Sequence, residues 1–203
     1  MPGDEPRREP EQPDWGSVGM SPEAKQECEE YIRWIREDFA EAKRTRLKVL
    51  VWGPGTCAGG KMFEKREQIR DRLRRNFDDA ALFSEELDEV CRQFSASSRV
   101  NELFQAHRAD FILALYSSPG SIAEVHDMAK TLGWKMLIFI DSRHVESYGF
   151  KGLLGELKSS FNNVETFEYP TDIDECHLMA AVVNKLEPLR IAKWLAKKMG
   201  VVL

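Results

Sequence analysis

The segment from Ser118 to Glu124 combines residue types that suit a binding site for phosphate or sugar hydroxyls. It follows an apolar run and precedes a predicted helix. Gly120 lets the backbone approach a ligand closely, while Ser118 and Ser121 supply hydroxyls. The N-terminus of the helix offers free N–H groups and a partial positive charge. Glu124 adds a carboxylate in the first helical turn, beside the expected pocket.

The same spacing also has a purely structural interpretation. Ser121 and Glu124 stand three residues apart, which is the spacing of a capping box at a helix N-terminus. Spacing alone therefore favours capping over catalysis. Glu124 is also predicted to lie at the switch in strand order, where ligands bind such sheets, and this position makes a functional role more plausible than spacing alone does.

A second glycine-containing loop, residues 52–61, follows the first predicted strand. It lacks the spacing of a Walker P-loop, so an ATPase site of that kind is rejected. Gly53 and Pro54 are candidates for lining a pocket. Trp52 could stack on a base, although an indole at a strand end is more often part of the core. Cys57 is a weak candidate nucleophile because no paired histidine is evident.

Charged residues near these loops also have two interpretations. Residues 61–76 form a predicted helix in which basic and acidic side chains alternate, as on a solvated face with i,i+4 pairs. Arg66 is the candidate for substrate binding among them, because it could reach a phosphate from the helix beside the first loop. Glu85 and Glu86 follow the second strand, and each could contact a sugar hydroxyl or simply cap a helix.

Five short runs rich in β-branched and aromatic residues alternate with helical patterns. The predicted strands are 47–52, 80–83, 111–116, 136–140 and 164–167. The predicted helices between and after them include 61–76, 84–94, 98–108 and one from about Asp172 to about Lys198, which Pro188 should kink or divide.

This alternation predicts an α/β fold with a single doubly wound, mostly parallel five-stranded sheet and helices on both faces. The natural strand order is 2-1-3-4-5, numbered along the chain. Ligands bind such sheets at the carboxyl ends of the strands, near the switch between strands 1 and 3. The loops after Trp52 and Tyr116 should therefore face each other and form the site.

The chain organisation follows from composition. Residues 1–20 are rich in proline, glycine and charge, so we expect a disordered or loosely docked tail. Residues 21–44 form an extra N-terminal helix with a partly aromatic face, which should pack on the domain or on a second subunit. Residues 45–203 form the α/β domain.

The totals exclude several classes of protein. The 203 residues carry a formal net charge of −5, so duplex nucleic acid is not the expected partner. The four cysteines form no Cys-x-x-Cys pair and no compact Cys/His set, which predicts free thiols in a reducing cytoplasm. No cofactor is expected. Neither a signal peptide nor a membrane-spanning run is expected.

Several of these features together resemble the nucleoside 2-deoxyribosyltransferase family over roughly residues 47–145. The similar elements are Ala109-Asp110 before a strand, Pro119-Gly120-Ser121-Ile122-Ala123-Glu124 after it, and Met128-Ala129 in the helix. Gly53-Pro54 after the first strand matches the family's Gly-Pro start. Related patterns occur in nucleotide N-glycosidases and, more distantly, in TIR-type NAD hydrolases.

The resemblance implies that Glu124 is the nucleophile, or the stabiliser of an oxocarbenium-like centre, at the sugar C1′. The family usually carries an aspartate a few residues before the Gly-Thr, but the corresponding residues 116–118 contain no acid. This departure puts deoxyribosyl transfer in doubt and leaves room for hydrolysis of a nucleotide, a nucleoside or NAD. The resemblance further implies a homo-oligomer without a metal, and relatives of this kind are often toxins or defence effectors.

Two interpretations from other functional classes stay open. In one, the same pocket binds a nucleotide and the chain is a sensor that signals through the N-terminal helix. In the other, residues 1–44 dock the chain onto a protein partner and the α/β domain serves a larger complex. Loss of turnover without loss of ligand in Glu124→Gln would separate an enzyme from a sensor.

Overall fold

The structure of the chain is a computed structural model. It describes residues 19–55, 60–93, 97–116, 125, 128–145, 152, 155, 158–159, 164–169, 171–174 and 177–201. The chain divides into two compact units, residues 1–41 and 42–203. The tail expected over residues 1–20 lies almost entirely outside the described residues.

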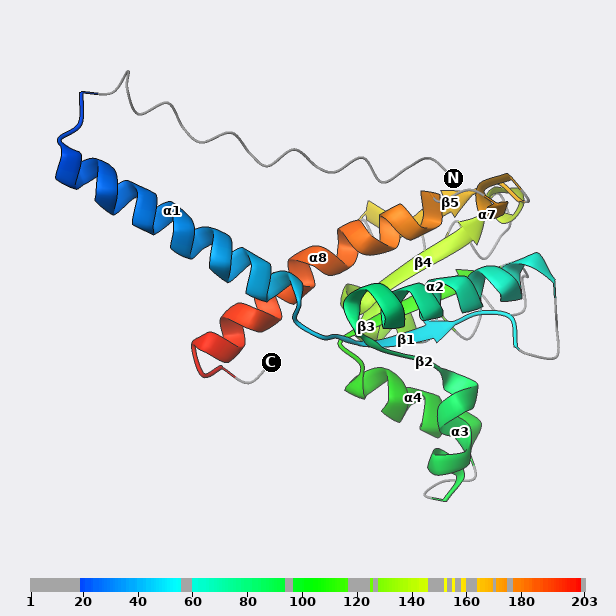
Figure 1. Ribbon diagram of the computed structural model, residues 1–203. Helices are drawn as coiled ribbons and strands as arrows, with labels where there is room; N and C mark the ends of the chain where they lie inside the picture. The colour runs from blue at the N-terminus through cyan, green and yellow to red at the C-terminus, as the bar shows by residue number, and fades with distance from the viewer. Residues whose placement is uncertain are drawn as a thin grey trace. The chain divides into compact units, whose positions relative to one another are not determined.

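Five parallel strands form one sheet in the order β2-β1-β3-β4-β5 (Figure 1). The strands are β1 (Lys48–Trp52), β2 (Ala80–Phe83), β3 (Phe111–Tyr116), β4 (Met136–Asp141) and β5 (Val164–Phe167). The α/β fold and the predicted strand order are confirmed, and each strand begins and ends within one residue of its predicted bounds. The switch in strand order falls between β1 and β3, as expected.

Both faces of the sheet are covered by helices. The odd-numbered residues of β3 pack in one cluster with side chains of α2 (Lys61–Phe77) and α8 (His177–Lys198). The even-numbered residues of β3 pack in a second cluster with Ala106 of α4 (Ser98–Arg108) and with Val125, Met128, Ala129 and Leu132. All six residues of β3 are buried because a central parallel strand faces a helical layer on each side.

The remaining described helices are α1 (Pro22–Lys43), α3 (Ser84–Arg92), α7 (Thr171–Asp174) and two short 3-10 turns, η2 (Gly133–Lys135) and η3 (Ser142–His144). Of these, α1 and α3 lie close to their predicted positions, α7 falls at the start of the helix predicted from about Asp172, and the two 3-10 turns were not predicted. The side chain of Ser21 accepts a hydrogen bond from the N–H of Ala24 at 3.2 Å and so caps α1. Within the described residues, no helix is both long enough and apolar enough to cross a membrane.

A kink or a division was expected at Pro188, and the division does not occur, since α8 continues through this residue as one helix. Proline removes one hydrogen bond, at a cost of about 3 kcal/mol in a helix interior. Pro188 and Asn184, whose carbonyl loses its donor, are both exposed, so water can reach that carbonyl. The opposite stripe of α8 is buried along its length and includes Val182, Leu186 and Trp194, and this packing outweighs the defect.

Two ion pairs join α8 to the amino end of the sheet. Arg190 forms a two-pronged pair with Asp79, and Asp79 also accepts the N–H of Leu47 at 2.9 Å. Lys193 pairs with Asp110 at 2.6 Å, and Asp110 accepts the N–H of Lys48 at 2.7 Å. Each aspartate therefore binds both the helix and the start of β1, which fixes the layer on the sheet.

Candidate functional site

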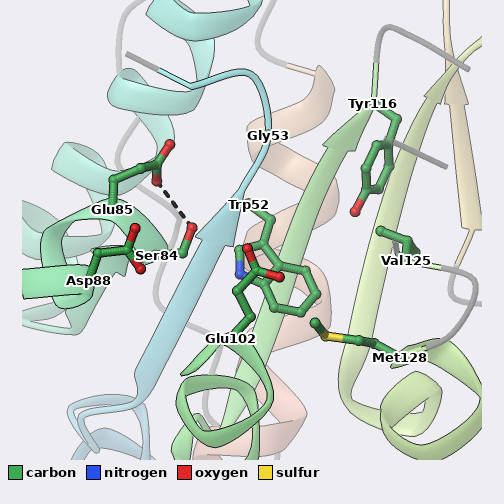
Figure 2. A pocket seen from close by; sticks show the side chains of 9 residues that line it. All are labelled: Trp52, Gly53, Ser84, Glu85, Asp88, Glu102, Tyr116, Val125 and Met128. Atoms are coloured by element: carbon green, nitrogen blue, oxygen red, sulfur yellow. Dashed lines mark hydrogen bonds between the residues drawn. The ribbon is translucent and has the colours of Figure 1, made fainter. Parts of the chain in front are cut away.

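A cavity of about 190 Å³ opens at the carboxyl ends of β1, β2 and β3 (Figure 2). The described residues that line it are Trp52, Gly53, Ser84, Glu85, Asp88, Glu102, Tyr116, Val125 and Met128. Trp52 and Tyr116 end β1 and β3, and Ser84 begins the helix that follows β2. The cavity therefore lies at the switch in strand order that the sequence predicted for the site.

Gly53 is required for close packing below the cavity. A Cβ built on this residue would lie 3.2 Å from the carbonyl oxygen of Leu115 and 3.2 Å from Cδ of Arg66. The carbonyl belongs to the backbone of β3 and has little freedom to move. Glycine at this position thus lets the loop after β1 pass tightly over its neighbour strand, while a direct contact with substrate stays a prediction.

Arg66 lies beneath the same loop with none of its side chain exposed. Its guanidinium donates to the carbonyl of Val51 twice, at 3.1 and 2.8 Å, and to the carbonyl of Pro54 at 2.9 Å. Two further bonds reach Glu85 at 2.8 and 2.6 Å. Because a guanidinium has five N–H donors, all of them are in use. A phosphate contact by Arg66 would require one of these bonds to open.

Glu85 presents a fixed negative charge to the cavity. Burial alone would raise the pKa of this carboxyl, but the hydrogen bonds from Arg66 and from the backbone, together with the charge of Arg66, lower the pKa below its usual value. Ser84 also donates to it at 3.1 Å, as Figure 2 shows. Its neighbour Glu86 has the capping role, since its carboxylate accepts the N–H of Phe83 at 2.6 Å.

Two aromatic side chains form part of the wall. Trp52 and Tyr116 both pack in the core on the even-numbered face of the sheet and both line the cavity. Trp52 is therefore both a core residue and a residue of the cavity wall. Only 8% of Trp52 is exposed, and its buried indole Nε1 has no hydrogen-bond partner among the described residues. An unpartnered buried N–H is uncommon and calls for an acceptor.

Two further carboxylates line the cavity that the sequence did not single out. Asp88 lies one turn after Glu85 on α3, and its nearest basic partner is Arg92 at a distant 4.0 Å. Glu102 reaches the cavity from α4 (Figure 2). The i,i+3 spacing of Glu85 and Asp88 was a usable signal, because these positions share a helix face. Glu102 had none, since its place depends on how α4 packs.

Four residues of the predicted site, Ser118, Gly120, Ser121 and Glu124, lie outside the described residues, as does Cys57. In the chain, however, residues 117–124 connect Tyr116 directly to Val125, and both of these line the cavity.

No group of three or more His, Cys, Asp or Glu in the described part of the chain is arranged to hold a metal ion. The comparisons with known proteins add no family: no family model matches the sequence, and no curated protein matches it.

Proposed function

We propose that the chain is an N-glycosidase that hydrolyses the bond between base and sugar in a nucleotide, a nucleoside or NAD. The observation that carries the proposal is the cavity at the strand switch, with its aromatic and acidic wall and with Tyr116 and Val125, the residues that flank 117–124 in the chain, in its lining. An aromatic wall suits a flat base. Carboxylates suit a sugar whose ring becomes positive as the bond breaks.

In this proposal Glu124 acts at C1′, either as nucleophile or as the stabiliser of the oxocarbenium-like centre. Trp52 and Tyr116 hold the base against the end of the sheet. Arg66 is a positioning residue, because its bonds to Val51, Pro54 and Glu85 hold the loop after β1 and the start of α3 in place. Water then takes the sugar, which distinguishes hydrolysis from transfer to a second base.

The direct test is a screen for free bases. The purified full chain is incubated with nucleoside monophosphates, nucleosides, deoxynucleosides and NAD, and products are identified by mass spectrometry. We expect one class of substrate to release its base. A free base together with a new nucleoside formed from an added base would instead indicate a transferase. No base from any substrate at high protein concentration would contradict the proposal and favour a sensing or interaction role.

A further inference from the structure

The charge on the wall of the cavity constrains which part of a substrate it accepts. Three carboxylates line it, and its described lining contains no lysine, arginine or histidine. Arg66 pairs with Glu85 through two hydrogen bonds and balances the charge of that carboxylate, so the acidic character of the wall depends on Asp88 and Glu102. Such a wall repels phosphate and attracts positive charge.

The aromatic part of the wall points in the same direction. Trp52 and Tyr116 present ring surfaces, and aromatic faces attract cations. The buried Nε1 of Trp52, turned in Figure 2 toward the side of the cavity where Ser84 lies, is a donor without an acceptor among the described residues. This unpartnered donor is independent of the acidic cluster and indicates a ligand that carries an acceptor.

We propose that the cavity binds a cationic heterocycle that bears a hydrogen-bond acceptor, as in an N-ribosylpyridinium carboxamide or an N7-alkylated purine nucleoside. Asp88 and Glu102 are its specificity-determining residues, and Trp52 donates to its acceptor. The substrate class rests on the proposed function, whereas the binding of the free cation does not. The occupant is a small cation rather than a phosphate.

The chemistry of the leaving group agrees with this choice. When the C1′–N bond of a cationic nucleoside breaks, its electron pair returns to the ring nitrogen and the base leaves neutral. The oxygen of water bonds to C1′ and its surplus proton passes to solvent, so no acid has to protonate the base. Glu85 could not serve as that acid near neutral pH, because its pKa is held below the usual value.

A matched pair of probes tests the inference without catalysis. The cation 1-methylnicotinamide and the neutral nicotinamide share the ring and the acceptor, and their binding to the full chain is measured by calorimetry. We expect the cation to bind about tenfold more tightly or better, because one nearby carboxylate is worth roughly that factor. In Glu102→Gln and Asp88→Asn the preference should shrink severalfold each.

The control is Glu187→Gln, which removes the same charge from a carboxylate that pairs with Lys43 at 2.9 Å on the surface. It should keep the full preference. Equal binding of the two probes, absence of binding by both, or an unchanged preference in Glu102→Gln and Asp88→Asn would each overturn the inference. Release of base from neutral nucleosides only would also overturn it while leaving the proposed function intact. Preferential binding of the cation without release of any base would support the cation site and contradict the proposed N-glycosidase function.

Discussion

Two buried arginines pair with carboxylates at opposite ends of the sheet, and they differ in what the carboxylate faces. At the amino end, Arg190 and Asp79 are both buried, with 3% and 0% of their side chains exposed. At the carboxyl end, Arg66 is fully buried, but 36% of the Glu85 side chain is exposed. Asp79 just precedes β2 and Glu85 closely follows it, so one short strand separates the two pairs.

The first pair has a structural role, whereas the second holds a carboxylate at the edge of a cavity. Every oxygen of Asp79 is engaged by Arg190 or the backbone inside the protein, so the pair serves to join α8 to the sheet. Glu85 is held just as firmly by Arg66, yet it lines a cavity. A rigid carboxylate that still faces an open space is what a preorganised binding site requires.

The largest effect on stability should come from breaking the closed pair. In Asp79→Ala, Arg190 would remain buried without its counter-charge, and loss of one partner of a buried pair costs about 3–5 kcal/mol. Urea unfolding followed by circular dichroism measures this. Asp71→Ala, which removes a partly exposed pair with Arg70, should cost less than about 1 kcal/mol. Similar losses in the two variants would contradict the contrast between the two ends.

Glu85→Gln should destabilise the fold less, by about 1–2 kcal/mol, because a bond to a charged group is replaced by one to a neutral amide. The effect should depend on pH. Since the folded pKa of Glu85 is lowered, its stabilising contribution is complete above the unfolded value of about 4.5 and is lost as pH falls through the lower folded value. The stability difference between wild type and Glu85→Gln should therefore shrink below about pH 4.5. A constant difference down to pH 3 would argue against the pairing.

The smallest effect on stability is expected for Glu102→Gln, within about 0.5 kcal/mol of wild type, because the side chain is only partly buried. Thermal unfolding monitored by circular dichroism checks this. If Glu102→Gln is as stable as wild type but its ligand preference is altered, then Glu102 acts in binding, in contrast to the structural Asp79. A loss comparable to that of Asp79→Ala would instead make Glu102 structural.

The sheet could be predicted from sequence because β3 and β4 are uninterrupted apolar runs, which only a strand covered on both faces requires. The buried state of Arg66 was also visible in principle. Met62, Arg66, Ile69 and Leu73 follow the i,i+4,i+7 spacing of one helix face, and all four are buried. The alternation of charges around Arg66 obscured that stripe and favoured a solvated face.

The rest could not be predicted because it depends on tertiary packing. Glu102 reaches the cavity only because α4 crosses the sheet beside β1, and nothing local in residues 98–108 specifies that crossing. The continuity of α8 through Pro188 likewise depends on its buried stripe, which outweighs the local preference of proline. Local rules failed where contacts distant in sequence decided the outcome.

The most direct test of the central claim compares Glu124→Gln with wild type on the substrate that the screen identifies. Turnover and ligand affinity are measured on the same preparations, with Glu187→Gln as control. If Glu124 acts at C1′, Glu124→Gln should lower kcat by about 100-fold or more while the dissociation constant of a non-reacting ligand changes less than about threefold. Unchanged turnover in Glu124→Gln would contradict the account.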